Sequence, residues 1–379
     1  MTVTLPFPRT APTSQPSITV VVVPREGFSC IQPSLDSIYK HTNIPFELVY
    51  VDAGSPRHIR KYLINSAAKR RFTLLCSDHF LSPNQARNLG LSQVTTDYVV
   101  FIDNDIHVSP GWLEHLWQCA QQTDAAVVSP LTCMGKPLHD RIRLAGGEVR
   151  IFVDVEGNQS RRCLYEKRFL VNRSAAAIKH QLYRRSCELV ELGCALIKRD
   201  IFDQIGPLDE KLLGSQEDVD FCLSVNRAAG KMFCEPAAVV THVPQSSISR
   251  TDLAYLMLRW SDAWEVESLT YFQQKWDLDM DHYFLQRYKQ LGQHRRQAFL
   301  YPLIGWLSRG RKMPWLMNFA IKLEQWFNQI IVDRHGRLPK TTVKKVMSAL
   351  PDDGISPQKQ FQRSVRNPVR RSEPHLMSH

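Results

Sequence analysis

The sequence predicts an α/β domain built on a mostly parallel central sheet that helices cover on both sides. Short and almost wholly apolar runs, at residues 18–23 and 98–102, are typical of strands buried on both faces. Segments with helical spacing of apolar residues separate such runs, and this alternation favours parallel strands joined by helical crossovers. Because ligands of open α/β sheets bind beyond the carboxyl ends of the strands, we expect the functional residues at that edge.

The expected elements follow one another in a regular order as far as residue 129. They are strand 18–23, helix 33–39, strand 46–51, helix 57–68, strand 72–76, helix 84–94, strand 98–102, helix 112–121 and strand 125–129. Residues 134–174 lack a clean periodicity, and we expect strands and loops there that form one side of the functional site. The domain is completed by helices at 200–205 and 217–229 and by a last strand at 237–241. We expect residues 250–333 to form a helical extension, and its many Trp side chains are expected by default to pack in a core.

Composition indicates a globular chain with reduced thiols. Hydrophobic residues make up 43% and charged residues 22% of the sequence, and no stretch has the length of an apolar membrane span. Nine cysteines without a C-x-x-C pair fit a cytoplasmic protein. Residues 1–16, rich in Pro, Thr and Ser, do not resemble a signal peptide and predict a flexible leader.

Basic residues are concentrated near the C-terminal end. The net charge is +11, and residues 334–379 hold ten Lys or Arg against three acids, which predicts a disordered tail. The apolar stretch 298–307 fits either a buried helix or peripheral contact with an anionic membrane surface, at the inner face of the membrane. Its basic flanks are Arg295, Arg296, Arg309, Arg311 and Lys312. Nucleic acid is not an expected partner.

Acidic residues follow two of the predicted strands. Asp52 comes at the end of the run 46–51, and Asp103, Asn104 and Asp105 follow the run 98–102. Residues i and i+2 of a strand end point the same way, so Asp103 and Asp105 can both face a divalent metal that offsets the charge of a leaving diphosphate. The alternative for both positions is a polar turn or helix cap after the strand.

The order of the motifs resembles inverting glycosyltransferases of family 2, which have the GT-A fold and use nucleotide sugars. The resemblance covers roughly residues 17–245, and the expected GT-A domain is residues 17–249. The matching segments are TVVVVP at 19–24, ELVYVDAGS at 47–55, ARNLGL at 86–91, DYVVFIDNDI at 97–106, ELGCALIKRDIFDQIGPLDE at 191–210 and EDVDFCL at 217–223.

The resemblance implies roles for particular residues. Asp52 would bind the nucleotide base, with Pro24 and Glu26 beside it, and Asp103 and Asn104 would also contact the nucleotide sugar. Asp105, Asp103 and His242 would hold Mn²⁺ or Mg²⁺. Glu217 and Asp218 match the acids that supply the catalytic base, and Asp218 is preferred. The expected acceptor is a saccharide or a lipid-linked sugar.

The chain departs from the family pattern at two positions, and other functions stay open. Arg25 stands where many relatives have Asn, and Ser224 stands where an Arg often follows Leu223. A nucleotidyltransferase could share the sheet, although the segment 24–30 is a poor phosphate loop. The chain could also be a basic protein that binds membrane or nucleic acid, or a scaffold that has lost turnover.

Overall fold

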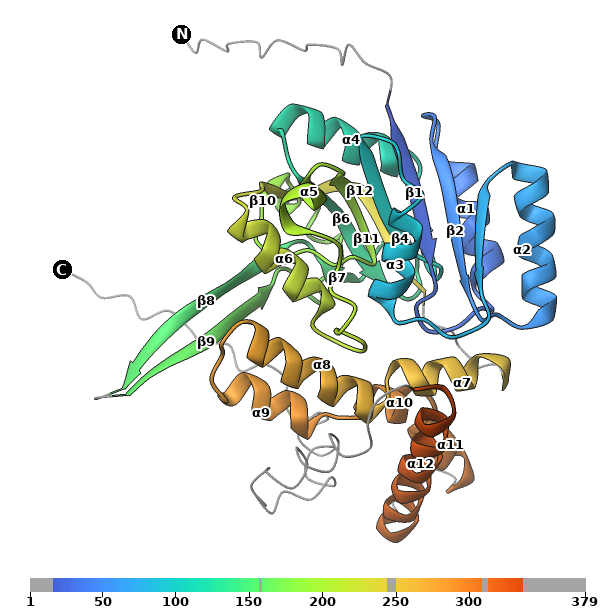
Figure 1. Ribbon diagram of the computed structural model, residues 1–379, viewed down its shortest axis with the longest axis vertical. Coiled ribbons are helices and arrows are strands. Elements are labelled where there is room, and N and C mark those ends of the chain that lie inside the picture. The colour runs from blue at the N-terminus through green and yellow to red at the C-terminus, as the bar shows by residue number, and fades with distance from the viewer. Residues whose placement is uncertain (1–15, 157–158, 244–249, 309–312, 337–379) are drawn as a thin grey trace.

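The structure is a computed structural model, and it describes residues 16–156, 159–243, 250–308 and 313–336. Within these residues the chain forms a central sheet flanked by helices, with further helices after residue 250 (Figure 1). The predicted α/β class with a mostly parallel sheet is confirmed. The leader expected at 1–16 and the tail expected at 334–379 lie outside the described residues, apart from residue 16 and residues 334–336.

The N-terminal half of the sheet is entirely parallel. Its strands are β1 (Ile18–Val23), β2 (Glu47–Ala53), β3 (Thr73–Ser77) and β4 (Tyr98–Asp103). β1 pairs with both β2 and β4, and β3 pairs with β2. All their carboxyl ends therefore meet at one edge, as the alternation of strands and helices predicted.

The other half of the sheet mixes directions. Its strands are β5 (Ile106–Val108), β6 (Val127–Met134), β7 (Ile142–Leu144), β10 (Arg185–Ser186), β11 (Cys194–Lys198) and β12 (Met232–His242). β11 lies antiparallel between β4 and β6, whereas β12 runs parallel to β6. Because β11 is antiparallel to both β4 and β6, those two strands run in the same direction, and so does β12. His242, the last residue of β12, therefore lies towards the edge where β4 ends.

Helices bury both faces of β1, which explains its continuous apolar sequence. Val20 and Val22 belong to the cluster that includes α1 (Ile31–His41), α2 (Arg57–Arg70) and α4 (Trp112–Thr123). Val21 and Val23 belong to the cluster on the other face, with α3 (Pro83–Leu91), α5 (Ile201–Ile205) and α6 (Glu217–Arg227). α3 approaches so closely that a Cβ on Gly90 would lie 2.2 Å from Val21 Cγ1, so only glycine fits there.

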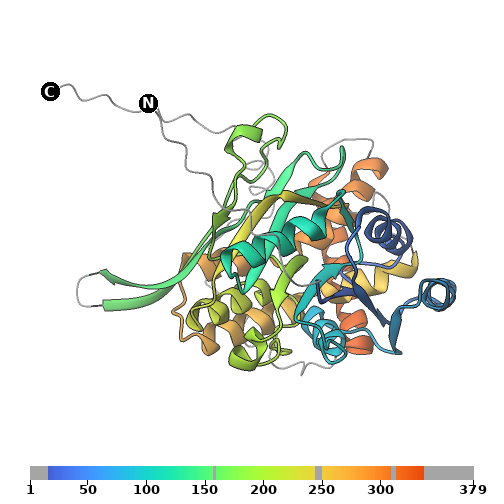
Figure 2. The same ribbon diagram turned by 90° about the horizontal axis from the view of Figure 1, so that it is seen from above.

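The segment without clean periodicity forms a long hairpin. β8 (Gly147–Glu156) and β9 (Gln159–Arg168) pair with each other as a two-stranded sheet, and Gly147 at the start of β8 also forms a single bridge with Leu189. The hairpin projects from the body of the molecule in both views (Figures 1 and 2). Its base lies beside α6, so the residues at that end of the hairpin can reach the site described below.

The predicted C-terminal extension is helical. It consists of α7 (Arg250–Arg259), α8 (Asp262–Lys275), α9 (His282–Lys289), α10 (Gln293–Arg295), the π-helical turn η2 (Arg296–Leu300), α11 (Tyr301–Leu307) and α12 (Pro314–His335). α8 and α9 pack into the main core, through Leu269, Phe272 and Phe284. The first part of the extension is therefore continuous with the α/β domain, and the domain boundary at 249 stays a prediction.

One expectation about this region is wrong. Arg295, predicted to form part of a basic flank of the stretch 298–307, is fully buried and pairs with Glu324 (2.6 Å) and Asp262 (3.0 Å). Its charge joins α10 to α12 instead of facing solvent. None of the helices in the described residues combines the length and apolar character that crossing a bilayer would need.

Candidate active site

The carboxyl edge of the sheet carries most of the residues predicted for the site. Pro24 ends β1, and the loop after it is held by Asn104: the Arg25 backbone N–H donates to Asn104 Oδ1 (3.1 Å), and Asn104 Nδ2 donates to the Gly27 carbonyl (2.7 Å). Asn104 thereby fixes the loop that presents Glu26. Its predicted contact with a nucleotide sugar stays a prediction.

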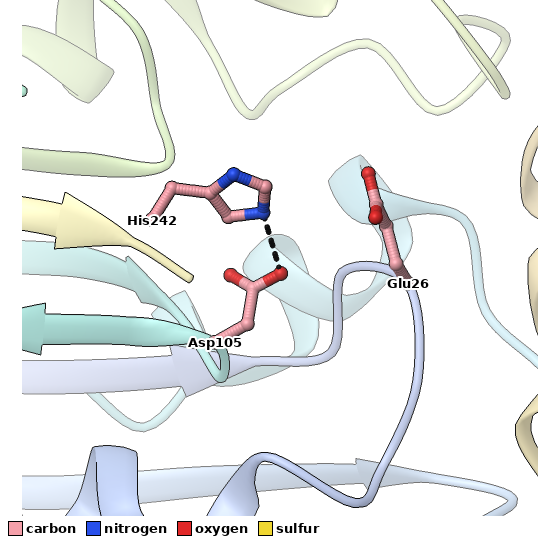
Figure 3. Close-up of side chains that lie close together, drawn as sticks. All are labelled: Glu26, Asp105 and His242. Atoms are coloured by element: carbon pink, nitrogen blue, oxygen red, sulfur yellow. Dashed lines mark hydrogen bonds and ion pairs between the residues drawn. The ribbon is translucent and has the colours of Figure 1, made fainter. Parts of the chain in front are cut away.

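Glu26, Asp105 and His242 converge from three segments of the chain (Figure 3). One potential ligand atom from each lies within 4.8 Å of the others, and His242 Nε2 is 2.9 Å from Asp105 Oδ2. Glu26 comes from the loop after β1, Asp105 follows β4 and His242 ends β12. Sequence reasoning paired Asp105 with His242, and it placed Glu26 with the nucleotide instead.

This cluster suits a divalent cation. Among the described residues, Asp105 Oδ1 is buried without a hydrogen-bond partner, so it has capacity for a further ligand, and His242 presents Nε2 to the same cluster (Figure 3). Two carboxylates and an imidazole are ligands that Mn²⁺ accepts, and Mg²⁺ prefers the carboxylate oxygens. The residues present therefore fit the metal that the family resemblance implies.

Glu26 has a partner from the C-terminal extension. His294 of α10 approaches it with Nε2 3.2 Å from Oε1, and its ring also stacks on Trp260 with centroids 4.2 Å apart. Burial alone would raise the pKa of Glu26. The contact with His294 and the charge of Arg25 outweigh that effect, and the pKa lies well below its usual range. Glu26 is thus kept as a carboxylate, the form that binds metal.

Asp103 contacts different partners from Asp105. Its Oδ2 accepts a hydrogen bond from Arg25 Nη1 (2.6 Å), and its Oδ1 lies 3.4 Å from Arg87 Nη2. A Cβ on Gly193 would lie 3.0 Å from Asp103 Oδ2 and 3.3 Å from Arg25 Nη1, so glycine leaves room for this pair. The structure therefore brings Asp103 to two arginines and not to the three-residue cluster, and its predicted role as a metal ligand stays a prediction.

Asp52 is buried at the end of β2 with both oxygens engaged. The Ser55 backbone N–H donates to Oδ1 (3.0 Å), and Arg60 Nε donates to Oδ2 (2.9 Å). The turn-capping role weighed from the sequence is present in the structure. A contact between Asp52 and a nucleotide base stays a prediction.

A polar pocket opens beside Asp103. Pro24 lines it, and six arginines line it with five acids. The arginines are Arg25, Arg87, Arg143, Arg168, Arg259 and Arg287, and the acids are Asp103, Glu166, Glu191, Glu217 and Asp218. Most of the charges pair with one another. A pocket with this many fixed cations is suited to a ligand that carries phosphate groups.

Glu217 and Asp218 begin α6 but have different surroundings. Glu217 is buried, and its Oε1 accepts a hydrogen bond from Arg259 Nη2 (2.6 Å). Asp218 is only partly buried and accepts one from the Leu192 backbone N–H (2.8 Å). Gln216 just before them has a left-handed backbone (φ 69°), an uncommon conformation for a residue other than glycine.

Asp218 is the acid better placed to exchange a proton. Desolvation in the pocket, together with the charges of Glu217 and Glu191, raises its pKa to about 6. A carboxylate with a pKa near the working pH is a stronger base than an ordinary aspartate and is still ionised at neutral pH. The geometry therefore distinguishes the two acids that the sequence offered together.

Several residues of the pocket had no predicted role. Arg87 and Glu191 lie inside quoted motifs, so the sequence did carry a signal for them. Arg259 and Trp260 also line the pocket, and His294 lies beside Glu26; all three come from the extension, far along the chain. They reach the site because the end of α7 lies at the pocket and α10 lies beside the loop after β1.

The chain resembles known proteins over this same region. Residues 18–206 match the family model described as Glycosyl transferase family 2. The pre-mycofactocin glycosyltransferase of Mycobacterium tuberculosis (strain ATCC 25618 / H37Rv) is 27% identical over 246 residues, which cover 64% of this chain and 45% of that protein. The O-antigen biosynthesis protein RfbC of Myxococcus xanthus is 22% identical over 234 residues, covering 61% and 18%. The chain thus spans less than half the length of these relatives.

Two solved structures match part of the chain. The crystal structure of GalNAc-T7 with UDP, GalNAc and Mn²⁺ matches with a TM-score of 0.46 and 16% identity, over 74% of this chain and 58% of that one. The crystal structure of S. aureus TarS 1-349 in complex with UDP-GlcNAc gives 0.42 and 16%, over 75% and 73%.

The sheet and the family match together define the class of protein as a glycosyltransferase. More particularly, the chain belongs to glycosyltransferase family 2, the family that its motifs resemble.

Proposed function

We propose that this protein transfers a sugar from a nucleoside diphosphate sugar to an acceptor hydroxyl with inversion at the anomeric carbon. The observation that carries the proposal is Asp218, a partly exposed carboxylate with a raised pKa in a pocket lined by arginines. The family match supports sugar transfer over nucleotidyl transfer. It also supports an enzyme over a basic binding protein.

The donor side of the site is formed at the edge of the sheet. Glu26, Asp105 and His242 would hold Mn²⁺ or Mg²⁺, which offsets the negative charge that develops on the leaving diphosphate. Arg25, Arg87 and Arg259 each have a buried Nε without a hydrogen-bond partner among the described residues, and all three line the pocket. These N–H groups are donors available to diphosphate oxygens. Asp52, Asp103 and Asn104 would orient the rest of the nucleotide sugar.

Asp218 would act as the general base in a single displacement. Its carboxylate accepts the proton of the acceptor hydroxyl while the acceptor oxygen forms a bond to the anomeric carbon. The bond from that carbon to the diphosphate breaks, and the diphosphate leaves with the electron pair. Glu217, held by Arg259, would position Asp218 and raise its pKa.

The acceptor would enter from the side of the hairpin. Arg143, Glu166 and Arg168 of β7 and β9 line the pocket with Glu191, and Arg143 and Arg168 both pair with Glu191. This wall is polar throughout, which suits the hydroxyl groups of a saccharide, free or linked to a lipid.

The test is product analysis with a panel of UDP-, GDP- and dTDP-linked sugars and a mixture of saccharide acceptors, with Mn²⁺ or Mg²⁺ present. We expect release of one nucleoside diphosphate, an inverted glycosidic linkage by NMR, and a rate loss of about 10²–10⁴-fold in Asp218→Asn. Glu47→Gln, an exposed acid at the opposite end of β2, is the matched control. Normal turnover by Asp218→Asn would remove Asp218 from the base role.

A further inference from the structure

The last two helices expose a broad apolar surface. Its most exposed members are Trp306 (77%), Trp315 (66%) and Trp326 (63%). We call this surface the α11–α12 face. It comprises Leu303, Trp306, Leu307, Trp315, Phe319, Leu323, Trp326, Phe327 and Ile330. Apolar patches of this kind on a soluble domain mark interaction sites.

This face is not the side by which α12 packs on the protein. Ala320, Glu324, Asn328 and Ile331 are buried on the other side of the helix, and Asn328 Nδ2 donates to the Met257 carbonyl of α7 (2.6 Å). The exposed positions recur every three or four residues from 315 to 330, which makes one continuous stripe along the helix. α12 therefore packs on the protein by a side that includes the polar residues Glu324 and Asn328, and it exposes an apolar side to solvent.

Basic residues outnumber acids among the exposed charges of α12 and in the sequence after it. The exposed charges of α12 are Lys322, Asp333 and Arg334, whereas the acid Glu324 is buried against Arg295 and Arg296. The sequence beyond α12, residues 337–379, contains nine Lys or Arg against three acids. The segment between α11 and α12 adds three more basic residues by sequence, although it lies outside the described residues and is not counted in the face.

We propose that the α11–α12 face docks on the surface of an anionic lipid bilayer. Trp side chains favour the boundary between acyl chains and headgroups, and neighbouring basic residues are attracted to anionic headgroups. A second copy of the chain is a poorer occupant. Each copy of the chain carries a net charge of +11, and the repulsion between two such chains would oppose self-association.

Docking would have a consequence for the active site. α12 packs on α7, which ends with Arg259, and Arg259 and Trp260 line the pocket that contains Asp218. A bilayer bound at the face would therefore hold the pocket in a fixed relation to the membrane surface. This proposal concerns membrane binding alone and does not depend on the proposed transfer reaction.

The test is flotation of the 379-residue chain with vesicles, without donor or metal. One set of vesicles contains equal parts of phosphatidylcholine and phosphatidylglycerol, and the other phosphatidylcholine alone. The variant Trp306→Ser/Trp315→Ser/Trp326→Ser removes the most exposed part of the face. Ile64→Ser/Tyr183→Ser is the matched control, because these side chains are also exposed (53% and 62%) but lie on other elements.

We expect the wild-type protein and the control to float with the anionic vesicles and much less with the neutral ones. The triple variant should bind the anionic vesicles about tenfold more weakly or worse, with an unchanged circular dichroism spectrum and thermal unfolding curve. Equal binding by the triple variant, or no binding by the wild type, would overturn the proposal. A concentration-dependent dimer that the triple variant abolishes would overturn it as well and assign the face to self-association.

Discussion

The acidic limb of the pH–rate profile should move to lower pH when Glu217 loses its charge. Glu217→Gln keeps a hydrogen-bond acceptor for Arg259 but removes the carboxylate next to Asp218. That carboxylate is one of the causes that raise the pKa of Asp218, second to desolvation. Without it, Asp218 ionises more readily, and the positive charge of Arg259 adds to the effect.

The size of the shift follows from the pKa of Asp218. An ordinary value of 3.8 is raised to about 6, and Glu217 is the second-largest cause after desolvation, so we expect a downward shift of about half a unit to one unit. A base must be deprotonated to act, so activity falls as the pH drops through the pKa. At pH 5 about a tenth of Asp218 is ionised in the wild type, and about a quarter to a half in the variant.

The assay is kcat/KM from about pH 4.5 to 8.5, which reports the ionisation of the free enzyme. The ratio of the rates at low and high pH is the readout, because the variant can also lose absolute rate. Glu47→Gln serves again as the control and should leave the limb in place. A limb that stays fixed, or moves to higher pH, in Glu217→Gln would refute the assignment of Asp218 as the titrating base.

Three further predictions concern residues around the site. Gly193→Ala places a methyl group 3.0 Å from Asp103 Oδ2, so donor affinity measured by calorimetry should fall, and unchanged affinity would contradict this prediction. The same crowding should lower the free energy of unfolding in urea by about 1–3 kcal/mol. His294→Ala removes the contact that holds Glu26, and Mn²⁺ affinity should fall about 10–100-fold, whereas an unaltered titration would exclude this positioning role. Arg295→Met leaves the buried Glu324 with only its 3.3 Å contact to Arg296, and should cost about 3–5 kcal/mol in urea unfolding; adding Glu324→Leu should restore part of that loss.

The parts of the fold predicted best are those in which sequence pattern and burial agree. β1 and β4 are buried on both faces, so their apolar runs gave their positions almost residue for residue. β12 was predicted from residue 237 only, because Glu235 and Pro236 interrupt its apolar run and the pairing shifts between Glu235 and Val239. The sequence did not predict β8 and β9 as separate strands, because much of the hairpin is exposed on both sides and lacks a buried apolar face.

The site was predicted in the same uneven way. Asp105 and His242 were expected together because the family resemblance implies that both are metal ligands, and the structure places them in contact. Asp103 was expected to share their ligand because of its spacing, but strand geometry cannot reveal the arginines that compete for it. Trp260 and His294 depend on how the extension packs, which no local motif encodes. The roles of all these residues in binding stay predictions.

The Trp residues of the C-terminal extension fall into two groups, one buried and one exposed. Trp264 and Trp276 are buried, in agreement with the default expectation of core packing, whereas Trp306, Trp315 and Trp326 are mostly exposed. The sequence alone does not separate them, since both groups occur at helical spacing. Only the arrangement of α12 on α7 shows which side of the helix remains uncovered.

Calorimetric titration of nucleoside diphosphates into the protein, with and without Mn²⁺, tests the central claim most directly. The wild type should bind one nucleoside diphosphate in a strictly metal-dependent manner, and Asp105→Asn should lose that dependence because the Glu26, Asp105 and His242 cluster is broken. Glu47→Gln should titrate like the wild type. Failure of every nucleotide to show metal-dependent binding, or wild-type titration by Asp105→Asn, would contradict the account.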